Sequence, residues 1–289
     1  MTFSKNVVVV TNKCNCGCIM CPQPPSKDPP DQHALNLRLL ESARAEGVPV
    51  IVLTGGEPTL VLDRLRNLLK VCKTKLPATD VLLLTNGRRL KDIETVKEIV
   101  SVRHSSLTFC VSLQADVDEI HDRIMGIEGA FADTVAGLHN LALLRQQVEI
   151  RVVIMRENYR RLPMLAEYIY RNMPFVCHVA LMGAELTGLA VDNISRVWID
   201  PADYAPLLTV AVRNLHRRAL RVSIYNLPFC LLPLELWSFA RDSISDWKKT
   251  FLPECSTCAA KDTCPGLFAT SAVQSPNIRP VAPIQQQCQ

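Results

Sequence analysis

The chain has 289 residues, of which 48% are hydrophobic and 21% charged, and its formal net charge is +4. These values predict one large globular domain with at most a small appendage, and they exclude a disordered chain. The mild net charge, without a basic run, argues against nucleic acid as a partner. No apolar stretch reaches the roughly 20 residues that span a bilayer, and the first residues are too polar for a signal peptide, so we expect a cytoplasmic protein without membrane attachment.

Up to residue 225 the chain alternates between strand and helix patterns. The β-branched run at 7–10 predicts a strand buried on both faces. Further strands are predicted at 50–54, 81–85, 107–113, 149–154, 175–182 and 222–225. Helices are predicted at 35–46, 60–76, 91–100, 116–144, 162–171 and 203–219. This alternation predicts right-handed βαβ units in an α/β fold, an incomplete (β/α)6-type barrel, with a doubly wound open sheet as the competing architecture.

Three segments are expected along the chain. Residues 1–225 form the barrel, and residues 226–274 form an irregular module rich in Pro and Cys. Residues 275–289, which are rich in Pro and Gln, are expected to be a flexible tail.

Twelve cysteines are many for a reducing compartment, where thiols more often bind metal than form disulfides. Cys14, Cys18 and Cys21 follow the first predicted strand with the spacing Cys-x3-Cys-x2-Cys. Three thiolates on one loop can bind three irons of a [4Fe–4S] cubane and leave the fourth iron open. Cys16 offers a fourth thiol, so a zinc site stays an alternative, although four thiolates within eight residues crowd a tetrahedral ion.

Polar residues and glycines follow the next predicted strands, at the edge where parallel β/α folds keep their active sites. Each of them also has a plain structural interpretation, as a turn or as a polar strand end. The candidates for contact with a bound cofactor are Gly55, Gly56, Glu57, Pro58, Thr85, Asn86, Ser112, Gln114 and Arg151. Among these, arginine suits a carboxylate because its guanidinium forms two parallel hydrogen bonds.

A second group of cysteines lies in the irregular module. Cys255, Cys258 and Cys264 have the spacing Cys-x2-Cys-x5-Cys, and Cys230 lies upstream. Four thiolates can hold either a structural zinc ion or a second [4Fe–4S] cluster. The spacing fits both, so the residues alone leave the metal open.

The first cysteine motif, placed after a first strand, resembles the signature of the radical S-adenosylmethionine (SAM) superfamily. The resemblance implies that the open iron chelates the amino and carboxylate groups of SAM. It also implies that an electron from the cluster cleaves SAM to a 5′-deoxyadenosyl radical, which abstracts hydrogen from a substrate. Residues 55–58 resemble the motif that holds the SAM amino group. Met20 stands where an aromatic residue near the adenine is common.

A closer resemblance is to the His-Xaa-Ser system radical SAM maturases of the C type. It is carried by Cys-Ile-Met-Cys-Pro-Gln-Pro-Pro at 18–25 and continues through most of the chain. The other matching segments are 54–59, 84–89, 129–140, 161–182, 225–233, 243–248 and 253–255. This resemblance implies a small protein substrate with His-Xaa-Ser repeats, a second radical SAM maturase as partner, and a flavodoxin or ferredoxin as electron donor. It also favours a second [4Fe–4S] cluster over zinc.

Two alternatives stay open. In the first, the chain is a radical SAM enzyme that acts on a small molecule or a tRNA nucleoside. In the second, it is a non-catalytic iron–sulfur or zinc scaffold. The mild net charge weakens the tRNA alternative. The scaffold alternative requires the Gly-Gly-Glu-Pro sequence at 55–58 to be a coincidence.

Overall fold

The computed structural model describes residues 5–283. Eight strands form one parallel sheet in which spatial order follows chain order. They are β1 (Lys5–Thr11), β2 (Val50–Gly55), β3 (Asp80–Thr85), β4 (Leu107–Ser112), β5 (Gln147–Ile154), β6 (His178–Gly183), β7 (Arg221–Tyr225) and β8 (Ala240–Arg241). No pairing joins β1 to β8 within the described chain, so the barrel is incomplete, as the sequence predicts.

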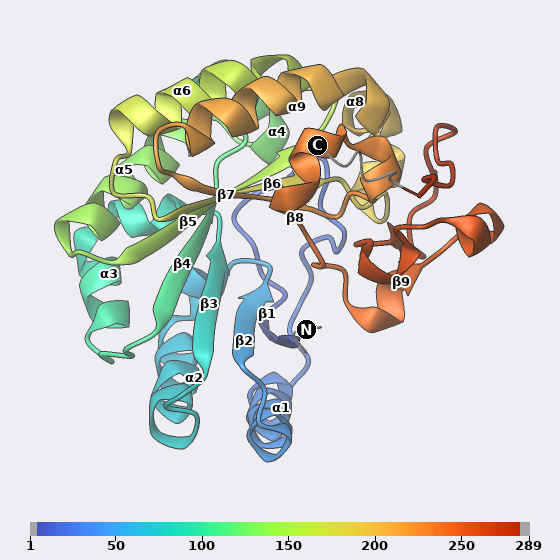
Figure 1. The fold of residues 1–289 in the computed structure, drawn as a ribbon. Coiled ribbons are helices and arrows are strands. Elements are labelled where there is room, and N and C mark those ends of the chain that lie inside the picture. The colour runs from blue at the N-terminus through green and yellow to red at the C-terminus, as the bar shows by residue number, and fades with distance from the viewer. Residues whose placement is uncertain (1–4, 284–289) are drawn as a thin grey trace.

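Helices cover the outer side of this curved sheet (Figure 1). They are α1 (Gln32–Glu46), α2 (Leu62–Lys75), α3 (Ile93–Val100), α4 (Asp118–Met125), α5 (Ala130–Leu143), α6 (Leu162–Asn172) and α9 (Pro201–His216). Two short helices after β6, α7 (Leu189–Asp192) and α8 (Ile194–Val197), pack in a smaller apolar cluster with Ile19. The strand residues that face them, such as Val8, Ile51 and Ile150, have no exposed surface and belong to one hydrophobic core. Because alternate strand residues point to opposite faces, the other half of each strand lines the inside of the barrel.

The predicted α/β fold is therefore confirmed, and the element bounds differ by a few residues. The helices predicted over 116–144 are α4 and α5, which separate where Gly126 and Gly129 adopt left-handed backbone angles. Strand β8 was not predicted, because two residues carry no periodic pattern.

The irregular module after β7 consists of short 3-10 turns and a two-stranded antiparallel ribbon, β9 (Lys249–Thr250) with β10 (Leu267–Phe268). It lies beside the open edge of the barrel (Figure 1). The expected tail begins inside a packed segment: Ser275 Oγ donates to Asp200 at 2.7 Å, and the backbone of Val281 bonds to Ala259 and to the Cys258 thiol. The packed part of the chain thus extends past the expected start of the flexible tail at 275, and residues 284–289 lie outside the described chain.

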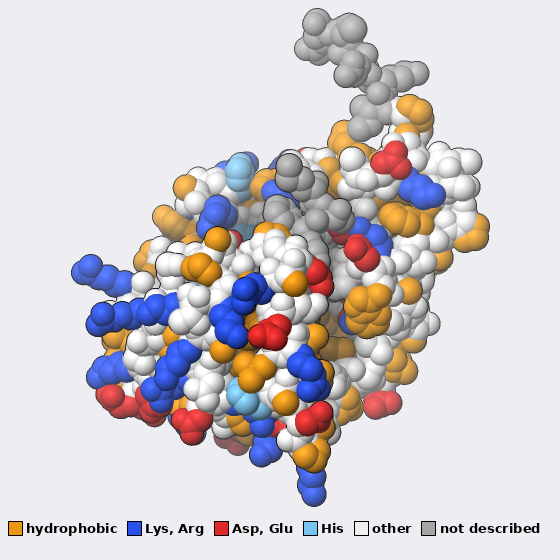
Figure 2. Space-filling model, turned by 90° about the horizontal axis from the view of Figure 1, so that it is seen from below, with side chains coloured by type: hydrophobic (Ala, Val, Ile, Leu, Met, Phe, Trp, Pro, Cys, Tyr) orange, Lys and Arg blue, Asp and Glu red, His pale blue; other side chains and the backbone are white. Residues whose placement is uncertain are grey.

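The surface seen from below Figure 1 carries basic and acidic side chains together with exposed hydrophobic ones (Figure 2). No helix among the described residues is long and apolar enough to cross a membrane.

Candidate active site

The cysteine loop leaves β1 and lies against the end of α4. The backbone N–H groups of Gly17 and Ile19 donate to the carbonyls of Met125 and Ile124, each at 3.0 Å. A Cβ atom on Gly126 would clash with the Gly17 carbonyl, so the close approach requires glycine there. The loop is therefore held by backbone contacts that do not depend on its own thiols.

The four thiols of this loop are gathered at the end of β1. Cys14 and Cys18 each lie near enough to Cys16 to influence the pKa of its thiol, while the Cys21 thiol donates to the Gln23 carbonyl at 3.0 Å. Soft thiolates on one loop fit an iron–sulfur cluster in donor chemistry. Among residues 5–283 no three His, Cys, Asp or Glu side chains are arranged to hold an ion as they stand, so the assignment of ligands rests on spacing and donor type.

The free thiols are poor acids in this setting. Hydrogen bonding with Cys16, together with burial, raises the pKa of the Cys14 thiol, and burial raises that of Cys21. They are therefore protonated at neutral pH without metal, and a bound cluster would replace these protons.

The end of β2 crosses directly under the cysteine loop. The N–H of Gly56 donates to the Thr11 carbonyl and the N–H of Glu57 to the Lys13 carbonyl, both at 2.7 Å. A Cβ atom on Gly55 or Gly56 would clash with these same two carbonyls. The two glycines are thus required for the contact between β2 and the cysteine loop.

The Glu57 carboxylate is buried and bound by its own chain. It accepts hydrogen bonds from Thr59 N (3.0 Å), Thr59 Oγ1 (2.6 Å), Thr85 Oγ1 (2.8 Å) and Asn86 N (2.7 Å). Burial raises the pKa of Glu57, and these four bonds oppose that rise. Pro58 opens the 3-10 turn Pro58–Val61 that carries Thr59. The carboxylate therefore ties the ends of β2 and β3 together and does not face open space.

Gln114 has a similar connecting role after β4. Its side-chain oxygen accepts from Val153 N at 2.9 Å, its backbone N–H donates to His121 Nδ1 at 3.1 Å, and its carbonyl accepts from Asn158 at 2.8 Å. The side chain is almost fully buried. Gln114 thus joins β4, α4 and β5.

His121 gives the protein a pH-dependent stability. Burial lowers the pKa of His121 to about 4, and its Nδ1 must stay unprotonated to accept from Gln114. A folded-state pKa below the ordinary 6.5 means that this stability is present above pH 6.5 and is lost as the pH falls toward 4. Between pH 7.5 and pH 4 the wild type should lose about 3 kcal/mol more unfolding free energy than a His121→Gln variant, which lacks the titrating imidazole. Parallel urea-unfolding profiles of the two proteins across this range would contradict the assignment.

Arg151 lies on the inner face of β5 and is part of a buried polar chain. Its Nε donates to Glu149 at 2.6 Å; the other Glu149 oxygen bonds His178 Nδ1 at 2.7 Å, and His178 Nε2 bonds Ser223 at 2.9 Å. The register places Ser112 of β4 beside Arg151. Nothing in the sequence pattern indicated Glu149, His178 or Ser223, which come from three different strands.

A cavity of about 620 Å³ lies at the amino ends of the inner strands, below this polar chain. Its lining includes Glu149, His178 and Ser223, and two cationic side chains, Arg221 and Arg241. This cavity lies at the end of the barrel opposite to the cysteine loop.

The second cysteine group comes together as expected from its spacing. Cys230, Cys255, Cys258 and Cys264 line one small cavity beside Phe251 and Val281. Burial raises the pKa of Cys230 and of Cys264, and the neighbouring thiols add to the rise. Four thiols around a space with apolar walls fit a zinc ion or a [4Fe–4S] cluster in donor chemistry.

A short segment after β6 links the cysteine loop to this module. The Leu189 N–H donates to the Cys21 carbonyl at 2.9 Å, and a Cβ atom on Gly188 would clash with the Pro22 carbonyl. On the other side, the Leu186 carbonyl accepts from Ala272 N at 2.9 Å. Met20 packs against the small apolar cluster that includes Leu186.

An incomplete parallel β/α barrel with three spaced cysteines at the carboxyl end of its first strand defines the class of enzymes that use an iron–sulfur cluster and SAM. The family model of the radical SAM superfamily matches residues 8–169, and the chain belongs to this superfamily. It is thus a radical SAM enzyme, and this fold implies a [4Fe–4S] cluster and SAM as cofactors.

The similar proteins include enzymes named for coproporphyrin and heme synthesis, and the solved structure of SuiB. An Fe-coproporphyrin III synthase from Methanosarcina barkeri is 31% identical over 75% of this chain and 55% of its own length. An AdoMet-dependent heme synthase from Oleidesulfovibrio alaskensis is 28% identical over 52% of this chain and 38% of its own length. The chain thus spans about half the length, or less, of these relatives. SuiB of Streptococcus suis, solved with SAM, has a TM-score of 0.61 at 20% identity over 76% of this chain and 49% of its own, which shows a shared fold.

Proposed function

We propose that this enzyme cleaves SAM reductively and modifies a small protein or peptide with His-Xaa-Ser repeats. The observation that carries the SAM part is the cysteine loop held over the ends of β2 and β3, with Cys14, Cys18 and Cys21 as the cluster ligands. A [4Fe–4S] cluster bound there supplies the electron that cleaves SAM to methionine and a 5′-deoxyadenosyl radical.

The residues around the loop divide into two groups in this proposal. Ser112 and Arg151, neighbours on β4 and β5, face the barrel interior. Arg151 is paired with Glu149 through its Nε, and the rest of its guanidinium, with Ser112, would bind the SAM carboxylate. Gly55 and Gly56 would bring backbone close to its amino group, and Met20 would pack on the adenine. The others are engaged by their own chain and would act by holding the strand ends in place. These are Glu57, Pro58, Thr85, Asn86 and Gln114.

The peptide substrate is supported by the resemblance to the His-Xaa-Ser system maturases, which extends from residue 18 to residue 255. SuiB, which shares the fold, has also been solved with its precursor peptide SuiA. In the same proposal a second radical SAM maturase works beside this enzyme, and a flavodoxin or ferredoxin donates the electron. Reduced thiols suit the cytoplasm, where both would meet it.

The cysteines at 230, 255, 258 and 264 would hold a second [4Fe–4S] cluster, with zinc as the alternative. We divide the chain accordingly into a barrel, residues 1–225, and a module that begins at 226 and includes the packed residues up to 281. Counting iron, sulfide and zinc in the purified protein separates the two fillings: about eight irons per chain supports two clusters, and four irons with one zinc supports the alternative.

A tetrapyrrole substrate is the second candidate, and one observation favours it. The curated relatives are named for coproporphyrin and heme synthesis.

The deciding experiment uses the anaerobically reconstituted, reduced enzyme with SAM. A synthetic His-Xaa-Ser repeat peptide and Fe-coproporphyrin III are added in separate reactions, and 5′-deoxyadenosine and product masses are recorded. A mass change in the peptide with an unchanged porphyrin supports the first candidate. Decarboxylation or another mass change of the porphyrin, with an unchanged peptide, replaces it with the second. Absence of 5′-deoxyadenosine from a fully loaded enzyme would overturn both.

A further inference from the structure

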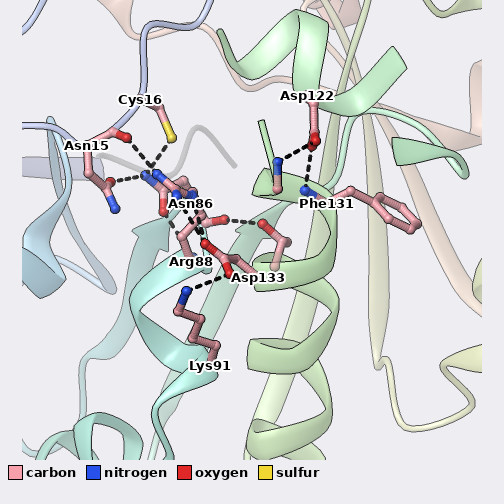
Figure 3. Close-up of polar contacts among 10 residues, drawn as sticks. Asn15, Cys16, Asn86, Arg88, Lys91, Asp122, Phe131 and Asp133 are labelled. Atoms are coloured by element: carbon pink, nitrogen blue, oxygen red, sulfur yellow. Dashed lines mark hydrogen bonds and ion pairs between the residues drawn. The ribbon is translucent and has the colours of Figure 1, made fainter. Parts of the chain in front are cut away.

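A partly buried ion-pair group lies behind the cysteine loop (Figure 3). Arg88 opens the 3-10 turn Arg88–Lys91 after β3, and Asp133 comes from the first turn of α5. Arg88 Nη2 and Nε lie 3.0 and 3.2 Å from Asp133 Oδ2, and Lys91 Nζ lies 2.7 Å from Oδ1. One carboxylate thus stands between two cations, so the group carries a net charge of about +1 by formal charges.

Arg88 also reaches the cysteine loop itself. Its Nη1 donates to the Asn15 carbonyl at 2.7 Å. The neighbouring Asn86 places its side-chain N–H₂ group 2.8 Å from Asn15 Oδ1, 3.3 Å from Cys16 Sγ and 3.9 Å from Cys14 Sγ. Two donors from the end of β3 therefore contact the loop between its first two proposed ligands.

Burial makes this charge effective. The side chains of Arg88 and Asp133 are only 14% and 16% exposed, whereas Lys91 is 55% exposed. Water and salt screen a partly buried charge less than an exposed one, so Arg88 acts more strongly than Lys91 on groups a few ångströms away.

We propose that Arg88, with Asn86, is a positioning residue that fixes the cysteine loop and raises the reduction potential of the cluster the loop binds. The inference rests on the proposed function, because it takes Cys14, Cys18 and Cys21 as the ligands. Reduction adds one negative charge to the cluster, and a fixed cation and N–H donors near its sulfurs stabilise that added charge. Neither residue touches the reacting atoms: Arg88 acts through the loop and through its field.

The test is a redox titration of the full-length reconstituted protein, followed by electron paramagnetic resonance. The signal to follow is the one that changes when SAM is added, which separates this cluster from any second one. Arg88→Gln is expected to lower the ratio of reduced to oxidised cluster about tenfold at a fixed potential, which corresponds to a shift of about 59 mV to more negative potential. Lys91→Gln is the matched control. It removes the other cation that pairs with Asp133 but makes no contact with the loop, so the shift in reduction potential should be clearly smaller.

Two further variants separate charge from mere loosening. Asp133→Asn removes the opposing negative charge and should shift the potential in the positive direction, opposite to Arg88→Gln. Arg88→Lys keeps the charge and should recover most of the potential, and it also decides the matter if Arg88→Gln does not fold. An unchanged potential in the Arg88 variants, or shifts of the same sign in Arg88→Gln and Asp133→Asn, would overturn the proposal. A wild-type protein without any SAM-responsive signal would instead refute the proposed function.

Discussion

Cys18→Ala is expected to abolish SAM cleavage and to remove about four irons per chain, the content of one cubane. The substitution takes away the middle of the three spaced thiolates on the loop after β1 and leaves two, too few to hold a cluster with one open iron. The loop itself should keep its fold, because Gly17 and Ile19 bind α4 through backbone groups. The measurement is 5′-deoxyadenosine by chromatography, together with iron and sulfide content.

Cys72→Ala is the matched control for this result. Cys72 is fully buried in α2 and packs in the main core, away from both cysteine groups. Its truncation should cost about 1 kcal/mol of stability from the lost apolar contact and leave SAM cleavage intact. A Cys18→Ala protein that still formed 5′-deoxyadenosine would show that the ligand set is wrong and would turn attention to Cys16.

Glu149→Gln is expected to lower the unfolding free energy at pH 7 by about 3 kcal/mol, the largest loss of stability that we predict for a polar substitution. The carboxylate lies almost fully buried between Arg151 and His178. Burial alone would raise its pKa, but the hydrogen bond with His178 and the charge of Arg151 prevail and lower the pKa of Glu149 to about 2. Without the charge, Arg151 stays buried beside a neutral amide.

The same pKa fixes the pH dependence. A folded-state pKa below the ordinary 4.5 means that the stabilisation is present above pH 4.5 and is lost as the pH falls toward 2. The gap between wild type and Glu149→Gln should therefore close over this window in urea-unfolding measurements. Glu167→Gln serves as control, because that carboxylate pairs with Arg171 and Arg218 on the surface and should change little. A gap that stays constant down to pH 2.5 would contradict the ion-pair account.

The fold could be predicted from the sequence because every main strand is a short apolar run between helical patterns. From the run at 7–10 to the strand at 147–154 and beyond, strands alternate with helices, and few topologies accommodate this order. Strand β8 lacked such a signal: its two residues are a strand only because β7 pairs with them. Its position depends on tertiary contact and not on local preference.

The candidate site was predictable where it depends on spacing and not where it depends on pairing. The cysteine motif and the glycines at 55 and 56 are local patterns, and the structure brings them into contact. Arg88 and Asp133 lie 45 positions apart, and Glu149 bonds a histidine 29 positions away. Such partners carry no periodicity, so only the folded arrangement of strands reveals them. For the same reason the sequence did not reveal that Glu57, a candidate for contact with a bound cofactor, is enclosed by three residues of its own chain.

The loop after β1 depends on hydrogen bonds to residues that are synthesised much later, and this has a consequence for biosynthesis. The backbone of residues 17–21 forms hydrogen bonds with the backbone of Met125, Ile124 and Leu189, and Arg88 donates to the carbonyl of Asn15. A ribosome exposes the cysteines long before these partners, because domains are assembled only as their distant contacts emerge. We therefore expect the nascent chain to lack a folded cluster-binding loop at first. Delivery of an iron–sulfur cluster should begin only after residue 189 has left the exit tunnel.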